Sequence, residues 1–122
     1  MVKVLAVMAV IAVLCNCAYG GEVTGLASWY GGGEKLNEYT ASGKRFNPTE
    51  AGLASWDYTF GTMLVITNLD NGKSVECMVT DRGPAKRLYR QGRIVDLYRG
   101  CFERMANLRE GVIRVSVRVL DT

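Results

Sequence analysis

Histidine is absent from the 122 residues of this chain, so any acid/base chemistry must depend on carboxylates, tyrosines or hydroxyls. Basic blocks are absent as well. The formal net charge is only +3, so nucleic acid is not an expected partner. The chain also has no internal repeat, no low-complexity segment and no linker-like stretch. These absences favour a single compact domain that acts on something other than nucleic acid.

The longest apolar run, Val4–Leu14, has eleven residues, about half of the roughly 20 that a membrane-spanning helix needs. Following a lysine, this run predicts an export signal. Small residues before Gly21 predict cleavage there, whereas lipid attachment at Cys15 or Cys17 is the alternative. Residues 1–20 are thus expected to be a signal peptide, ordinary or lipoprotein. The protein is expected in the periplasm, in the cell envelope or outside the cell, touching the membrane only through such a lipid anchor.

Residues 21–122 number about 100, enough for one domain and too few for two, and a monomer is expected. Cys77 and Cys101 fall in this part. In an exported protein an even cysteine count predicts one disulfide, and two buried reduced thiols are the alternative. A catalytic thiol is not expected, because no imidazole is present to activate it.

Strand signals dominate this domain. Val23–Tyr30 predicts a first strand, and the polar residues 34–48 predict a long loop. Met63–Asn68 and Ser74–Val79 predict a hairpin, because an Asn-Gly pair lies between them. The alternation of apolar and polar residues over 113–119 predicts a half-buried strand.

A helical pattern is confined to residues 97–107, where Leu97, Cys101 and Met105 form one apolar face. Asp96 or a neighbour is expected to cap the start of this helix. About six short strands with one or two short helices predict a small, mainly β, closed barrel.

Two apolar runs end in carboxylates, one at Asp81 before a Gly-Pro turn and one at Asp96. Two strand-end carboxylates held on a rigid barrel suit acid/base work on a sugar bond. Structural roles are the alternatives: Asp81 would bond backbone amides of the turn, and Asp96 would cap the helix.

Several motifs resemble the rare lipoprotein A (RlpA) family. In family order they are GLASWYG at 25–31, TASGKRF at 40–46, FGT at 60–62, VITNL at 65–69 followed by Asn-Gly, TDRGP at 80–84 and GRIVDL at 92–97. The resemblance covers essentially all of 21–122 and implies a six-stranded double-psi β-barrel. Expansins and family-45 endoglucanases are more distant members of the same barrel class.

RlpA proteins are lytic transglycosylases of peptidoglycan, so the resemblance implies glycan strands as the partner and no cofactor or metal. Such enzymes cleave between N-acetylmuramic acid and N-acetylglucosamine without water and leave a 1,6-anhydro sugar. Asp81 is implied as the acid/base, with Asp96 in support. Ser55 stands where the family commonly has a histidine, the second catalytic residue. Since a serine hydroxyl neither releases nor takes up a proton near neutral pH, slow or absent cleavage is expected.

Aromatic and cationic side chains near the motifs are expected to bind the glycan. They are Trp29, Tyr30, Trp56, Tyr58, Arg82 and Arg93. The rings would stack on sugar faces and the guanidinium groups would bind muramyl carboxylates. Completing the core is the alternative for Trp29 and Tyr30, and pairing with the two aspartates is the alternative for the arginines.

The sequence therefore leaves competing hypotheses. The first is a peptidoglycan lytic transglycosylase, impaired by the missing histidine. The second is a non-catalytic, expansin-like module that binds cell-wall polysaccharide. A secreted effector or inhibitor that uses the barrel to bind a protein is the third.

Overall fold

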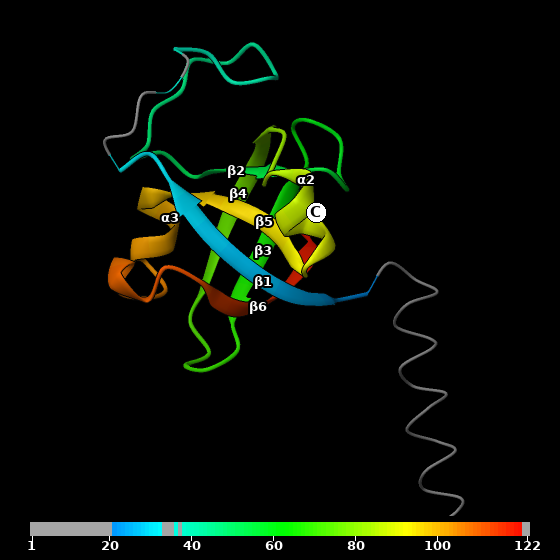
Figure 1. The fold of residues 1–122 in the computed structure, drawn as a ribbon, viewed down its shortest axis with the longest axis vertical. Helices are drawn as coiled ribbons and strands as arrows, with labels where there is room; N and C mark the ends of the chain where they lie inside the picture. The colour runs from blue at the N-terminus through cyan, green and yellow to red at the C-terminus, as the bar shows by residue number, and fades with distance from the viewer. Residues whose placement is uncertain (1–20, 33–35, 37, 121–122) are drawn as a thin grey trace, which may run out of the picture.

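The computed structural model describes residues 21–32, 36 and 38–120, which form a closed β-barrel (Figure 1). In chain order the elements are β1 (Val23–Tyr30), β2 (Gly52–Ser55), β3 (Met63–Asn68), β4 (Ser74–Asp81), α2 (Lys86–Arg90), β5 (Arg93–Tyr98), α3 (Arg99–Glu103), η1 (Leu108–Glu110) and β6 (Ile113–Val119). The predicted signal peptide lies outside the described residues. Within them, no helix has the length and apolar character needed to cross a membrane.

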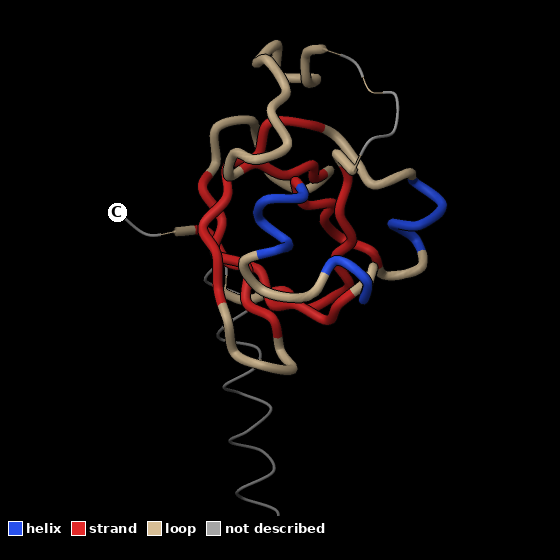
Figure 2. The backbone as a smooth tube through the Cα atoms, turned by 90° about the vertical axis from the view of Figure 1, so that its left-hand side faces the viewer, coloured by secondary structure: helices blue, strands red, loops and turns tan. Residues whose placement is uncertain are grey.

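The strands close into a ring, seen in Figure 2, and their order around the barrel is β1-β5-β2-β4-β3-β6. Two of its pairs are parallel, β1 with β5 and β2 with β4. The other four strand pairs are antiparallel. Parallel neighbours need long crossover connections, and here each crossover passes other strands of the same barrel. The predicted mainly β, six-stranded barrel is confirmed.

Period-2 alternation separates the barrel's interior from its outer face. On β6, Ile113, Val115 and Val117 are buried, while Arg114 and Arg118 are exposed, as the sequence predicted. The β3–β4 hairpin is also confirmed, with β4 running on to Asp81. The same alternation decides which side chains face the core and which line the outer surface near that aspartate.

The helix predicted over 97–107 is present but much shorter than expected. Leu97 belongs to β5, which continues to Tyr98, and α3 covers only Arg99–Glu103. Asp96 is therefore a strand residue and caps no helix. The apolar positions do face the core, because a buried strand followed by a short helix reproduces the same spacing. Sequence reasoning also missed α2, which buries none of its residues and so has no apolar periodicity.

The long polar loop between β1 and β2 contains a compact segment, residues 38–46, here named the strap. A bridge between Tyr39 and Arg45 closes it, and Thr40 N–H donates to Lys44 O at 2.8 Å. Ser42 N–H donates to Thr80 O at 3.1 Å, which ties the strap to β4. Beyond this tie, the loop projects from the barrel at the top of Figure 1.

Cys77 and Cys101 are free thiols in the structure, so the predicted disulfide is not present. Both side chains are fully buried and occupy core positions on β4 and α3. The hydrogen bond that Cys77 makes to Cys101, together with burial, raises the pKa of the Cys77 thiol. The two residues behave as small apolar core residues, which was the alternative for this pair.

We expect both core thiols to resist alkylation in the native protein and to react fully once it is unfolded without reductant. Burial excludes the reagent, and a raised pKa keeps Cys77 in its unreactive protonated form. Peptide mass spectrometry after iodoacetamide treatment, with and without guanidinium, measures this at each cysteine. Failure to react in guanidinium would contradict the free thiols.

Candidate functional site

A pocket of about 290 Å³ lies between the strap and the last residues of β1 and β4. It is lined by Tyr30, Leu36, Tyr39, Thr40, Ala41, Phe46 and Asp81. Among these lining residues Asp81 is the single carboxylate. Its walls are otherwise aromatic, aliphatic or hydroxylic, which is the composition expected of a small-ligand or sugar site.

A register shift aims Asp81 at this pocket. On β2, Leu53 pairs with Val79 of β4, but the next residue, Ala54, pairs with Asp81. Thr80 is therefore the extra residue of a bulge, and such bulges redirect side chains at functional sites. The shift places Asp81 on the outer face, beside Ala54, rather than in the core with Val79.

Three donors hold the Asp81 carboxylate. Oδ1 accepts the backbone N–H of Ala41 at 3.0 Å and that of Arg82 at 3.0 Å. Oδ2 accepts the hydroxyl of Tyr30 at 3.3 Å. The predicted structural alternative, bonding to turn amides, is thus present, and it leaves the side chain at the pocket.

Small residues on β2 let two tyrosines reach across it to β4. The ring of Tyr98 lies over Gly52, where a Cβ atom would be 2.5 Å from the ring. The Tyr98 hydroxyl shares a 2.6 Å hydrogen bond with Thr80. Tyr30 packs against Tyr98 edge-on, with ring centroids 5.4 Å apart, and stacks on Phe46 at 5.3 Å. This aromatic cluster fixes one wall of the pocket.

Tyr30 is held as a protonated donor. Burial, followed by the charge of Asp81, raises the pKa of Tyr30 well above its ordinary value, and Tyr98 and Asp96 add to the rise. Its hydroxyl therefore remains a hydrogen-bond donor over the whole working range of pH.

Asp96 lies near the site without lining the pocket. Ser28, Asp96, Ala54 and Asp81 form one row across four neighbouring strands. Two strand spacings separate the aspartates, about 10 Å between Cα atoms. Ser28 donates its hydroxyl to Asp96 Oδ1 at 3.1 Å. Asp96 therefore acts on the pocket through its charge, as its contribution to the pKa of Tyr30 indicates.

Ser55, the residue at the family's histidine position, lies at the end of β2. It is fully buried, and its hydroxyl accepts the backbone N–H of Asp57 at 3.0 Å. The side chain thus fixes the turn after β2 and does not line the pocket.

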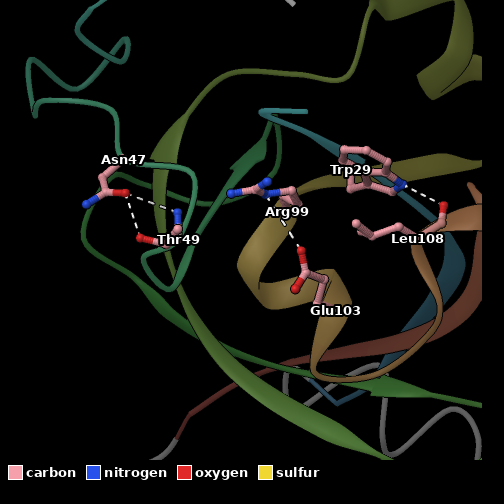
Figure 3. A network of polar contacts seen from close by, with 6 residues as sticks. All are labelled: Trp29, Asn47, Thr49, Arg99, Glu103 and Leu108. Carbon is pink, nitrogen blue, oxygen red and sulfur yellow. Dashed lines mark hydrogen bonds and ion pairs between the residues drawn. The ribbon is translucent and has the colours of Figure 1, made fainter. Parts of the chain in front are cut away.

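Trp29 is not among the residues that line the pocket, and its indole reaches Leu108 (Figure 3). Its indole N–H donates to Leu108 O at 3.1 Å, and its ring lies 6.4 Å from that of Phe102. The expected glycan contact of Trp29 gains no support from this position. Trp29 completes the core, which was the alternative.

Two exposed rings form what we name the aromatic ledge, Trp56 and Phe60 on the β2–β3 loop. They are 39% and 40% exposed. The Trp56 indole donates to Pro84 O at 2.6 Å, and the Lys86 ammonium lies 4.9 Å from its ring centroid. The Arg82 guanidinium lies 4.0 Å from the Phe60 centroid. These contacts hold both rings beside the turn that follows Asp81 (the β2–β3 loop adjoins α2 in Figure 1).

The remaining residues that were expected to bind glycan make other contacts or lie outside the pocket. They are Arg82, Tyr58 and Arg93. Arg82 Nη1 donates to Ser55 O at 2.8 Å and to Tyr58 O at 2.7 Å, so this guanidinium fastens the β2–β3 loop. Tyr58 is half-buried and packs against the core. Arg93 is half-buried at the start of β5 and does not line the pocket.

The strap residues of the pocket were missed by sequence reasoning, namely Leu36 beside the strap and Tyr39, Thr40, Ala41 and Phe46 within it. Only the TASGKRF motif at 40–46 pointed to this segment. No group of three metal-ligating side chains that could hold an ion occurs in the described parts of the chain. The site is built from hydrogen-bond donors, rings and one carboxylate.

The sequence model of one protein family, described as "Lytic transglycolase", matches residues 22–117. The chain is 43% identical over 98 residues to the "Probable endolytic peptidoglycan transglycosylase RlpA" of Aquifex aeolicus, covering 80% of this chain and 41% of that protein. It is 38% identical over 122 residues to the protein of the same name from Treponema pallidum, covering 94% and 36%. The chain thus spans less than half the length of these curated relatives.

Solved structures share the barrel at lower identity. The Streptomyces papain inhibitor superposes with a TM-score of 0.64 at 20% identity, covering 84% of this chain and 96% of the inhibitor. An apo expansin from Clavibacter michiganensis superposes with a TM-score of 0.62 at 18% identity, covering 82% and 50%. At these identities the likeness shows the fold, a double-psi β-barrel.

Proposed function

Because this chain belongs to the lytic transglycolase family and has its double-psi barrel, we propose that it cleaves peptidoglycan glycan strands. The bond cleaved joins N-acetylmuramic acid to N-acetylglucosamine, and the products carry 1,6-anhydro ends. Relatives named endolytic peptidoglycan transglycosylase support the substrate class. This substrate implies a site of action outside the cytoplasm, in the periplasm or cell envelope.

The observation that supports this reaction type is that Asp81 is the one carboxylate among the described residues that line the pocket. Hydrolysis of glycosides commonly uses two carboxyl groups that flank the bond, one of them activating water or acting as nucleophile. Asp96 is not among the described residues that line the pocket. A transglycosylase obtains its nucleophile from the substrate's own C6 hydroxyl, and one acid/base group is then enough.

In the proposed reaction Asp81 serves twice. Its protonated carboxyl gives a proton to the glycosidic oxygen as the bond from that oxygen to C1 breaks. The C6 hydroxyl oxygen then bonds to C1, and its proton passes to the Asp81 carboxylate, which restores the acid. Neither water nor a cofactor is consumed. The hydrogen bonds at Oδ1 keep the group in place throughout.

The proposed glycan path crosses Asp81 from the strap to the aromatic ledge. Tyr39 on the strap is 56% exposed and lines the pocket. Beside the turn that follows Asp81, Trp56 and Phe60 present exposed rings in fixed positions, suited to stacking on sugar faces. Sugars on both sides of the cleaved bond would therefore contact aromatic rings.

The alternative function is a non-catalytic, expansin-like module that binds the same glycan. The observation that favours it is the buried Ser55 at the family's histidine position. Under this alternative, cleavage would require a second proton carrier, which Ser55 does not provide, and only glycan binding would remain.

Incubation with purified sacculi, followed by mass spectrometry of the soluble fraction, tests the proposal. Release of fragments with anhydro-muramyl ends is the expected result. Retention on sacculi with no soluble fragments would replace the enzyme by the binding module. Fragments with ordinary reducing ends would show hydrolysis and contradict the single-carboxylate mechanism.

A further inference from the structure

We propose that Tyr30 is a positioning residue for the acid/base step, in which its hydroxyl holds Oδ2 of Asp81, the oxygen that gives and takes the proton. This inference rests on the proposed transglycosylase function and deepens it, because it assigns separate roles to the two carboxyl oxygens.

The two oxygens differ in their hydrogen bonds. Oδ1 accepts two backbone N–H groups, from Ala41 and Arg82, each at 3.0 Å. Amide donors cannot accept a proton in return, so Oδ1 is fixed as an acceptor in both protonation states. Oδ2 accepts one longer bond, from the Tyr30 hydroxyl at 3.3 Å. The transferable proton therefore belongs on Oδ2.

The Tyr30 hydroxyl is suited to this contact because the strength of its hydrogen bond depends on the charge of Asp81. When Asp81 is neutral, the bond is an ordinary one between uncharged groups. As the proton leaves, the bond becomes charge-assisted, and such bonds are shorter and stronger. An interaction that strengthens as the reaction proceeds lowers the barrier instead of merely tightening substrate binding.

The surroundings keep the hydroxyl in place. Phe46 stacks on the Tyr30 ring and Tyr98 packs edge-on against it. The titratable groups that act on Tyr30 are Asp81 on β4 and Asp96 and Tyr98 on β5, and all three disfavour its ionisation. Ser55 is engaged with the turn after β2. Among the described residues, Tyr30 is thus the side chain that donates to Asp81.

Tyr30→Phe keeps the stacked ring and removes only the hydroxyl. We expect kcat to fall about 10- to 100-fold. We expect KM to change by less than about threefold. The pH–rate profile should move to higher pH, because loss of a donor disfavours the ionised carboxylate. A purely structural role would lower stability and leave the profile in place.

A titration that does not need activity separates this inference from the proposed function. The Asp81 carboxyl carbon is followed by NMR against pH in the wild type, in Tyr30→Phe and in the control Tyr89→Phe. The control removes a matched Tyr-to-Asp hydrogen bond, 2.6 Å to Asp57, outside the pocket. The signal of the Asp81 carboxyl carbon should differ from that of the wild type in Tyr30→Phe and match it in the control.

The outcomes are distinguishable. If the wild type releases nothing from sacculi, the proposed function fails, and the NMR titration still decides whether Tyr30 holds Asp81. If the wild type is active and Tyr30→Phe matches it in kcat, pH profile and Asp81 titration, the role of Tyr30 is overturned and the transglycosylase remains.

Discussion

Asp81→Asn is expected to slow the release of anhydro fragments from sacculi by about 10²- to 10⁴-fold, the range for loss of a general acid/base. Asparagine keeps the shape of the side chain, and its Oδ1 still accepts the N–H groups of Ala41 and Arg82. The fold should therefore persist while the transferable proton is lost. Initial rates of release, with thermal unfolding of both proteins, measure the two effects separately.

Asp70→Asn is the matched control for this change. Asp70 is exposed on the β3–β4 turn and pairs with Arg114 at 2.7 Å. Its replacement should leave the rate within about twofold, since exposed ion pairs contribute at most about 1 kcal/mol to stability. Equal rates for Asp81→Asn and Asp70→Asn would remove Asp81 from the mechanism.

Trp29→Ala is expected to lower the free energy of unfolding by about 3 kcal/mol, at the low end of the range for truncating a large aromatic residue. Trp29 packs on Phe102 and donates to Leu108, so the loss falls on the core under α3 and η1. Trp56→Ala should change stability by about 1 kcal/mol or less, because its ring is 39% exposed. It should instead weaken binding to sacculi.

Urea denaturation and sedimentation with sacculi, applied to both variants, give a two-way comparison. The structure predicts that Trp29→Ala is the less stable variant. It predicts that Trp56→Ala is the variant that binds sacculi more weakly. The reverse pattern, a stable Trp29→Ala protein that no longer binds sacculi, would place Trp29 in the groove and contradict the assignment of the aromatic ledge.

Local patterns predicted the parts of the site that depend on strand alternation. Asp81 was found because an apolar run ends there before a turn. The same alternation also distinguishes Trp29 from Tyr30: Ala27 and Trp29 point inward, while Ser28 and Tyr30 point outward. Assigning both aromatic residues to the groove ignored this period of two.

Other features depend on contacts between distant residues. Leu97, Cys101 and Met105 fit a helical spacing, yet they lie in a strand, a short helix and the turn after it, and all three reach the core. The bond from Ala41 to Asp81 joins residues 40 positions apart, and no local pattern predicts it. The presence of Ser55 at the family's histidine position was visible in the sequence. The burial of Ser55 and the contact of Tyr30 with Asp81 became visible only in the three-dimensional structure.

The most direct test of the central claim, that one carboxylate transfers the glycan to its own C6 hydroxyl, is digestion of sacculi in ¹⁸O-labelled water. Mass spectrometry of the released fragments should show anhydro-muramyl ends that carry no label, because water takes no part. Labelled reducing ends would show that water is the nucleophile and would contradict the proposed chemistry of the Asp81 pocket.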